Sequence, residues 1–181
     1  MKKFILIPIF CIYGVLFSQN VKNDLVGYVE EHYSQILERI PLGKENLYGF
    51  ENREMFQNCE VGTPIKMLRI KNENEIEITN EWRVPLLFNG NPLTLLTVLD
   101  SGQNYEIVNI GGNILAKLID NYNSDGKKIS YMLRDFRNKT DYVSFELNSL
   151  SDKNFYKIEK SSASYERISL DEIIRLHNIN E

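Results

Sequence analysis

The sequence predicts an α+β fold in which helices pack on an antiparallel sheet. Strand-like runs are separated by short polar turns, and stretches with helical apolar spacing lie near the start, the middle and the end of the chain. Strands grouped in this way, with helices before, between and after them, are typical of antiparallel sheets rather than of alternating βαβ units. We therefore expect a sheet of about five to six strands with N-terminal, central and C-terminal helices, in an order similar to that of profilin-like or cystatin-like domains.

The first helix is expected over residues 23–40, where apolar side chains recur as one stripe and Pro41 ends the pattern. Residues 52–58 are expected to form a short helical turn capped by Asn52, because an Asn side chain accepts hydrogen bonds from the free N–H groups of such a turn. Met55 and Phe56 should then face the core.

The central helix is expected to run from Asn113, as its N-cap, to about Tyr122. Its buried face is expected to comprise Ile114, Leu115, Leu118 and Ile119. Gly111 and Gly112, just before it, could present N–H groups to an anion, but they lack the longer phosphate-binding glycine motifs, so we interpret them as a tight turn.

The last helix is expected to begin at Ser169, because Ser169 and Glu172 have the spacing of a capping box.

The strongest strand pattern is a three-stranded meander. From Trp82 to Phe88, large apolar residues recur at every second position, as in a strand with one buried face. Asn89-Gly90-Asn91 is typical of a hairpin turn because these residues tolerate positive φ. Leu93 to Leu99 is apolar on both faces, which predicts a central strand covered on both sides. Tyr105 to Ile110 completes the meander.

Further strands are expected on both sides of this meander. Pro64 to Ile70 precedes it, and the charged connector between the two has the weak alternation of a short strand around Ile76 and Ile78. The runs ISYMLRDF, DYVSFEL and NFYKIEK follow the central helix as three strand candidates. No repeat or linker divides residues 20–181, so we expect them to form a single α+β domain.

Residues 1–19 are predicted to be a secretory signal peptide. Lys2 and Lys3 precede an apolar run that is too short and too N-terminal for a typical spanning helix, and cleavage is expected near Gln19. An uncleaved anchor or a buried first strand is the alternative. Cys11 lacks the small residues that precede a lipid-attachment cysteine. We therefore expect a secreted or periplasmic protein without a stable membrane anchor after cleavage.

The charge and the cysteine content exclude several classes of protein. The formal charge is −4, and the loss of Lys2 and Lys3 would make it more negative. Nucleic acids and anionic membranes require a concentrated positive patch, so neither is an expected partner. Cleavage would leave Cys59 as the one cysteine, which precludes an internal disulfide, and we interpret it as a structural thiol.

Residues that usually carry catalysis are scarce. His32 and His177 are the two histidines, and both lie where we expect solvated faces of helices, so neither is expected to be catalytic. Their distance from each other and from Cys59 gives no zinc-binding spacing. No cofactor is expected.

One string is similar to the start of a calcium loop. Asn121, Asn123 and Asp125 place oxygen-bearing side chains at alternate positions before a glycine. An EF-hand requires a bidentate Glu at its twelfth position, where this chain has Met132. A simple polar turn is therefore the favoured interpretation, and calcium the weaker one.

Trp82 and Arg83 are the candidate residues for binding a ligand or partner. An exposed Trp–Arg pair is typical of protein interfaces, where both residue types are enriched among the contacts that carry binding energy. The alternation that continues through Val84 and Leu86 instead favours packing of Trp82 in the core.

Several short motifs resemble those of a family of uncharacterised secreted bacterial proteins. They are YGF at 48–50, VGTPI at 61–65, WRVP at 82–85, LLTV at 95–98, and IGG at 110–112 followed by LAKLI. The resemblance covers about residues 47–120 and implies export and a common fold. It implies no activity and no catalytic residues.

These observations lead to three hypotheses. The first is an exported, non-enzymatic domain that binds an unknown protein or small ligand in the cell envelope, because catalytic motifs are lacking and aromatic residues are frequent on the strands. The second is a carboxylate-dependent hydrolase, which would need two acids in one concave site. The third is an inhibitor or accessory protein of an exported enzyme.

Overall fold

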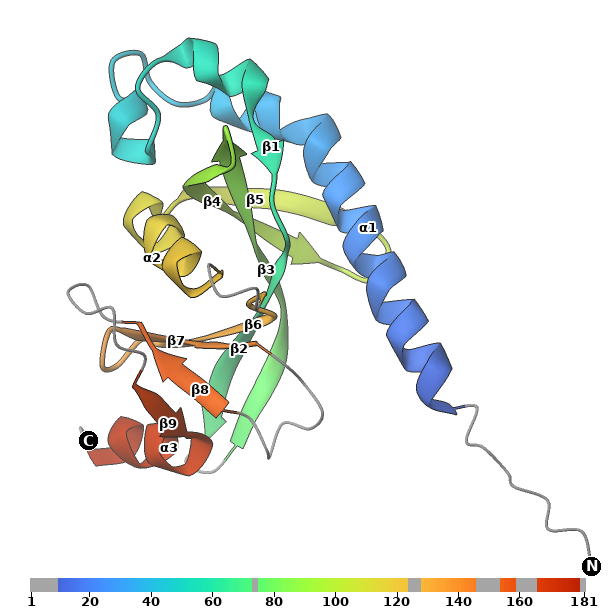
Figure 1. Cartoon of the computed structure of the whole chain (residues 1–181), viewed down its shortest axis with the longest axis vertical. Helices are drawn as coiled ribbons and strands as arrows, with labels where there is room; N and C mark the ends of the chain where they lie inside the picture. Colours follow the sequence, from blue (N-terminus) through green and yellow to red (C-terminus); the bar gives the residue numbers. More distant parts are fainter. Residues whose placement is uncertain (1–9, 73–74, 124–127, 146–153, 159–165, 180–181) are drawn as a thin grey trace, which may run out of the picture.

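A computed structural model of the chain describes residues 10–72, 75–123, 128–145, 154–158 and 166–179. Within these residues nine strands form one sheet, whose main path has the order β5-β4-β3-β2-β6-β7-β8-β9, with β1 paired to β3 (Figure 1). β2 and β6 are parallel, and the other pairs are antiparallel. The predicted α+β class is confirmed, but the sheet has more strands than we expected from the sequence.

The helices are α1 (Phe10–Leu37), α2 (Asn113–Asn123) and α3 (Leu170–Ile179), with the 3₁₀ turns η1 (Glu45–Tyr48) and η2 (Arg53–Asn58). The strands are β1 (Glu60–Val61), β2 (Ile65–Asn72), β3 (Glu75–Phe88), β4 (Asn91–Asp100), β5 (Tyr105–Gly111), β6 (Tyr131–Asp135), β7 (Thr140–Ser144), β8 (Asn154–Lys157) and β9 (Arg167–Ser169). None of the described helices combines the length and the apolar character that a membrane crossing requires.

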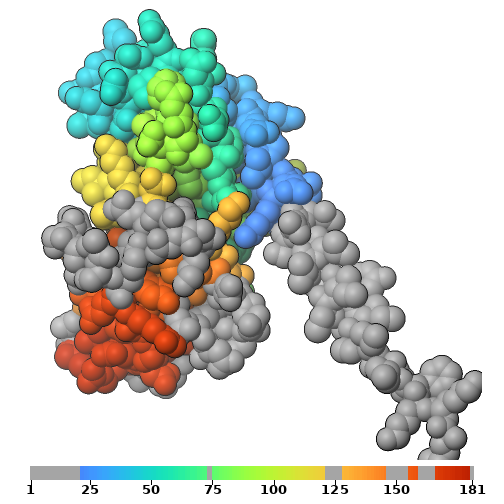
Figure 2. Space-filling model, viewed as in Figure 1, coloured from blue at the N-terminus to red at the C-terminus, as the bar shows by residue number. Residues whose placement is uncertain are grey.

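The parallel pair β2–β6 joins two groups of strands. β2 to β5 contain the expected meander, and β6 to β9 form the second group, which the chain enters through α2. In Figure 1, α1 and α2 lie on opposite sides of β3, β4 and β5, and α3 lies beside β9. Figure 2 shows the C-terminal group, orange to red, at one end of the molecule and the η1–η2 segment, cyan, at the other.

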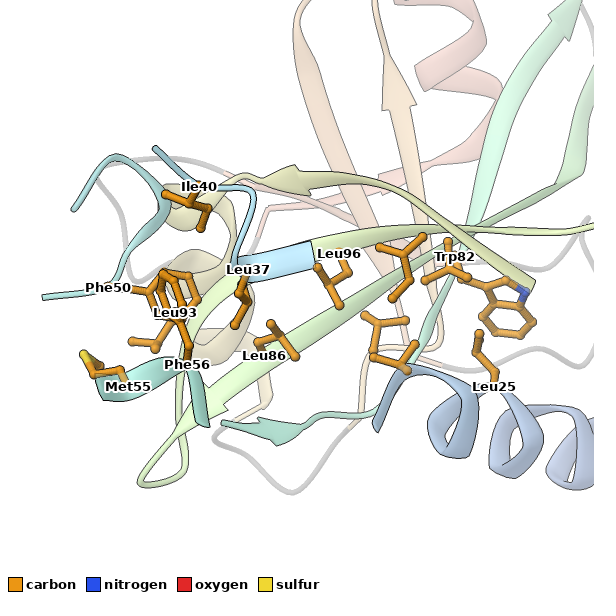
Figure 3. Close-up of a cluster of buried hydrophobic side chains, with 14 residues drawn as sticks. Leu25, Leu37, Ile40, Phe50, Met55, Phe56, Trp82, Leu86, Leu93 and Leu96 are labelled. Atoms are coloured by element: carbon orange, nitrogen blue, oxygen red, sulfur yellow. The ribbon is translucent and has the colours of Figure 1, made fainter. Parts of the chain in front are cut away.

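The largest apolar cluster lies between α1 and the meander. Its buried members include Leu25, Val29, Leu37, Phe50, Met55, Phe56, Trp82, Val84, Leu86, Leu96 and Val98. In Figure 3, Trp82 and Leu25 lie at one end of this cluster, and Phe50, Met55 and Phe56 at the other. The Asn52 side chain accepts a hydrogen bond from the Glu54 N–H at 3.0 Å, which confirms the predicted capped turn.

Two further clusters complete the core. One lies under α2 and comprises Ile65, Met67, Leu95, Ala116, Ile119, Ile129, Met132 and Val143. The other joins β9 and α3 to the sheet and comprises Leu68, Ile76, Leu133, Tyr142, Phe155, Ile168 and Ile173. β4 supplies Leu96 to the α1 cluster and Leu95 to the α2 cluster, so the prediction that this strand is covered on both faces is confirmed.

Turn and cap predictions are confirmed at two positions. Asn89 and Gly90 both have positive φ, 51° and 76°, and they link β3 to β4 as a two-residue hairpin of the kind that the sequence predicts. At the start of α3, the Ser169 hydroxyl accepts a hydrogen bond from the Glu172 N–H at 3.2 Å.

Other local predictions were wrong. The first helix was expected over residues 23–40, but α1 begins earlier, at Phe10, and ends earlier, at Leu37. In α2, Ile114 is 61% exposed and Ala116 takes its place in the core, because the smaller side chain allows the helix to lie close to β4. The Gly112 carbonyl, not that of Asn113, accepts the first intrahelical hydrogen bond, from the Ala116 N–H at 2.8 Å.

β3 also differs from the prediction. It runs without interruption from Glu75 to Phe88, so Ile76 and Ile78 belong to the same strand as Trp82 rather than to a separate short one. The apolar alternation keeps the same phase in both parts, but the polar residues 79–81 separate them, and the pairing of β3 with β2 is irregular there. β9 was not expected at all, since three residues give too short a pattern to detect.

Candidate functional site

The candidate site lies where β3 departs from regular pairing with β2. Residues 79–81 of β3 lie opposite the single β2 residue Met67. The Thr79 hydroxyl donates to the Met67 carbonyl at 3.0 Å and accepts from the Glu81 N–H at 3.1 Å. These two hydrogen bonds replace part of the β-ladder that is missing here and stabilise a β-bulge. Bulges often change the direction of side chains beside binding sites.

A cleft of about 360 Å³ opens at this bulge. We call it the arginine cleft and define it by Arg69, Glu77, Glu81, Arg83, Arg134 and Phe136, which line it together with neighbouring residues of β2 and β3. Its volume falls in the range of small-molecule sites, about 300–1,000 Å³. The side chains come from β2, from β3, from β6 and from the turn that follows β6, so the parallel pairing of β2 with β6 brings the site together.

The arginine cleft and α2 lie on the same face of the sheet. α2 covers this face at another part of β4 and leaves the cleft uncovered. Arg83 pairs in register with Thr97, and side chains two residues apart on a strand share a face. Thr97 therefore shares its face with Leu95, which packs under α2. Beyond the reach of α2, polar residues replace the apolar ones on this face.

The structure separates the two candidate residues of the sequence. Trp82 lies on the opposite face, only 6% exposed, within the α1 cluster, where the Lys66 Nζ lies 4.1 Å from its ring centroid. This favours the packing interpretation of Trp82 over the exposed-pair interpretation. Arg83 lines the arginine cleft.

The guanidinium of Arg83 is largely buried and only partly satisfied. Its Nη1 donates to the Thr97 hydroxyl, whereas its Nε is buried and has no acceptor among the described residues. Burial lowers the pKa of Arg83, and the nearby Glu81 carboxylate opposes that change. An arginine keeps its charge throughout the physiological range, so Arg83 lines the cleft as a cation whose buried Nε has no acceptor among the described residues.

The other cations of the cleft already have partners. Arg69 forms an ion pair with Glu77. Arg134 Nε lies 3.6 Å from Asp141 Oδ1, and its guanidinium carbon lies 5.4 Å from the Phe136 ring centroid. A separation of 3.6 Å is too long for a hydrogen bond, so these two charges attract each other without satisfying the carboxylate.

Two carboxylates of this region lack hydrogen-bond donors. Asp141 Oδ1 is buried without a hydrogen bond, and burial raises the pKa of Asp141 although Arg134 and Arg83 oppose the rise. The Glu81 side chain lines the cleft and has neither a hydrogen bond nor an ion pair with a described residue. The arginine cleft thus combines one unused donor, Arg83 Nε, with one unpaired carboxylate, Glu81, and Asp141 lies beside it.

A second polar cluster, which we call the α3 junction, joins the β6–β7 turn to α3. The buried Asp135 carboxylate accepts from the Asn138 Nδ2 at 2.7 Å and from the Arg137 N–H at 3.0 Å, and His177 Nδ1 lies 2.9 Å from it. Burial alone would raise the pKa of Asp135, but the hydrogen bonds from His177 and Asn138 outweigh it and hold this pKa below its ordinary value. The expectation that His177 lies on a solvated face was wrong, because the Asp135 contact leaves its side chain only 19% exposed.

The remaining candidate residues take no part in the cleft. Cys59 donates to the Met55 carbonyl at 3.2 Å, and burial raises the pKa of its thiol to about 11, so it is protonated at neutral pH. The side chains of the calcium candidates Asn121, Asn123 and Asp125 lie outside the described residues. Among the described residues, no three His, Cys, Asp or Glu side chains are grouped as a metal site would require.

Sequence reasoning did not identify most of the cleft. Arg69, Arg83 and Arg134 each interrupt a mainly apolar strand, and this was the available signal. An arginine inside a buried strand needs a polar partner or a polar opening. The sequence did not indicate that the three arginines face the same opening, because that depends on the parallel pairing of β2 with β6.

Comparisons with protein-family models, with curated proteins and with solved structures give no match to this chain. The resemblance over residues 47–120 therefore stays a prediction from the sequence. The function is inferred from the arginine cleft.

Proposed function

We propose that this chain is an exported, non-enzymatic domain that binds a small carboxylate-bearing ligand in the arginine cleft. One observation carries the proposal: the Nε of Arg83 is buried at the cleft and has no acceptor among the described residues. Leaving a buried donor unpaired costs about 1–3 kcal/mol. A carboxylate matches the planar donor geometry of a guanidinium, so a bound carboxylate would remove this cost.

The rim of the cleft supports a ligand that is also partly apolar. Phe136 is 76% exposed and Ile78 is 49% exposed, and both line the opening. Small-molecule sites typically combine apolar walls with a few fixed polar groups. The ring of Phe136 and the donor of Arg83 provide this combination.

Binding is favoured over the hydrolase alternative. Glu77 and Glu81 both line the cleft, but Glu77 is engaged by Arg69, which leaves Glu81 as the carboxylate without a partner there. Carboxylate-dependent hydrolysis requires a second acid free to act on the same bond. The inhibitor or accessory-protein hypothesis stays an untested alternative.

The ligand class is tested by thermal unfolding of the purified chain with 3-phenylpropanoate and with the matched alcohol, 3-phenylpropanol. We expect the carboxylate, but not the alcohol, to raise Tm in a concentration-dependent manner, because binding to the folded state alone stabilises it. Arg83→Met should abolish this rise. Arg39→Met, which alters an exposed arginine after α1, should preserve it. Equal effects of acid and alcohol, or an unchanged rise in Arg83→Met, would contradict the proposal.

Export is tested separately, by N-terminal sequencing of the protein recovered from the periplasm and the medium. We expect a mature chain that begins near residue 20. Recovery of intact chain from the cytoplasm alone would contradict this part. We also propose that the domain has a profilin-like or cystatin-like order of elements, which the three antiparallel strands β3, β4 and β5 followed by α2 support.

A further inference from the structure

We infer that the ligand of the arginine cleft is a free α-amino acid with an apolar, aromatic side chain. This inference rests on the proposed carboxylate site and adds two features to it. One is a positive charge on the ligand beside its carboxylate, and the other is a ring that packs at the rim.

The positive charge follows from the position of Glu81. Glu81 and Arg83 lie two residues apart on β3, so they share a face of the strand, and both line the cleft. Although they carry opposite charges and lie close enough for Glu81 to affect the pKa of Arg83, they do not form an ion pair. Both groups therefore remain available to one ligand that carries an ammonium and a carboxylate a short distance apart.

The bulge holds the backbone of Glu81 in place. Thr79 accepts a hydrogen bond from the backbone N–H of Glu81 and donates to β2, which fixes the backbone at the start of the regular strand. Bulges change the direction of the side chains that they carry. Glu81 and Arg83 thus carry opposite charges on one face of β3, and no ion pair joins them.

The other charges of the region cancel. Glu77 pairs with Arg69, and Asp141 lies beside Arg134. With Glu81 and Arg83 included, three arginines and two glutamates line the cleft and Asp141 lies beside it, so the charges of the region balance and favour neither a dianion nor a dication. A ligand whose own charges cancel, such as a zwitterion, therefore matches the charge balance of this site.

The apolar feature follows from the rim. Phe136 and Ile78 are exposed large apolar residues at the opening, and the guanidinium of Arg134 lies over the Phe136 ring. An aromatic side chain on the ligand would cover this surface and extend the stacking. Its backbone charges would then lie deeper in the cleft, at Glu81 and Arg83.

The test is isothermal titration calorimetry of the full chain with L-phenylalanine, 3-phenylpropanoate, which lacks the ammonium, and 2-phenylethylamine, which lacks the carboxylate. We expect L-phenylalanine to bind at least roughly tenfold more tightly than either analogue, the loss expected for one charge-assisted contact. L-Serine should bind more weakly than L-phenylalanine, because it cannot cover the rim.

Variants assign the two charges. Glu81→Gln should lower the affinity for L-phenylalanine and leave that for 3-phenylpropanoate unchanged, whereas Arg83→Met should weaken both. Glu106→Gln, an exposed position on β5, is the control and should change neither. Equal binding of L-phenylalanine and 3-phenylpropanoate to the unaltered chain would overturn the amino-acid inference while leaving the carboxylate site intact. Binding of neither compound would overturn both.

Discussion

Asp135 and Asp141 belong to the same β6–β7 hairpin, yet their surroundings are opposite. At the α3 junction, Asp135 is engaged by Asn138 and His177, and its pKa is held low. Beside the arginine cleft, Asp141 has a buried oxygen without a hydrogen bond, and its pKa is raised. The fold satisfies the first cluster with hydrogen bonds and leaves a buried oxygen of the second without a donor. The first cluster is therefore structural, whereas the second adjoins the cleft that we propose as a binding site.

The largest expected effect concerns the packed face behind the cleft. Trp82→Ala should lower the free energy of unfolding by about 3–5 kcal/mol, because it removes a large buried ring from the α1 cluster. Urea unfolding followed by circular dichroism measures this loss. Arg83→Met is the matched control, and we expect it to change stability by less than about 1 kcal/mol while ligand binding is lost. If both variants lowered the free energy of unfolding by similar amounts, Trp82 could no longer be assigned to the core and Arg83 to the binding site.

The next effect concerns the α3 junction. Asp135→Asn should lower the free energy of unfolding at pH 7 by about 2–3 kcal/mol, since it weakens charge-assisted hydrogen bonds to a buried group. Because the pKa of Asp135 is lowered in the folded state, its stabilisation is complete above the unfolded value of about 3.9 and is lost as pH falls through the folded value. Urea unfolding at a series of pH values should therefore show a weaker loss of stability in acid for the variant. If Asp135→Asn and the unaltered chain lost the same stability as pH falls, the role of the Asp135 carboxylate in acid unfolding would be contradicted.

A smaller effect is expected at the bulge. Thr79→Val keeps the shape of the side chain but removes two hydrogen bonds, so the free energy of unfolding should fall by about 1–2 kcal/mol. The affinity for L-phenylalanine should also fall, because Glu81 would lose its fixed position. Thr63→Val, at an exposed residue before β2, is the control. Unaltered affinity in Thr79→Val would show that the bulge does not position Glu81.

The smallest expected effect is at Asp141. Its pKa is raised in the folded state, so ionisation above that pKa opposes folding, and this penalty disappears as pH falls below the unfolded value of about 3.9. Asp141→Asn should therefore change stability at pH 7 by less than about 1 kcal/mol, in the stabilising direction. Urea unfolding measures this change. A loss as large as that of Asp135→Asn would mean that Asp141 is a structural group like its neighbour.

The sequence predicted those parts of the fold that depend on local patterns. The burial of β4 on both faces and the Asn89-Gly90 turn follow from apolar periodicity and from the conformations that these residues tolerate. The Ser169 cap likewise follows from residue types at a fixed spacing. Such features need no information about distant parts of the chain.

The features that the sequence did not predict depend on tertiary contacts. The bulge at Thr79 lies inside one continuous strand that we expected as two separate strands, and His177 is covered because the β6–β7 turn reaches α3. The arginine cleft depends on the parallel pairing of β2 with β6, which brings Arg134 beside Arg83. The sequence indicated Arg83 because it is next to Trp82. In the structure, Arg83 lies on the face of β3 opposite to Trp82, where it lines the arginine cleft.

The most direct test of the arginine cleft is a crystal structure of the protein with L-phenylalanine bound. We predict that the ligand carboxylate lies within hydrogen-bond distance of the Arg83 guanidinium and that its ammonium faces Glu81, with the ring against Phe136. A ligand bound elsewhere on the protein, or an empty cleft at saturating L-phenylalanine, would contradict the assignment of this cleft as an amino-acid site.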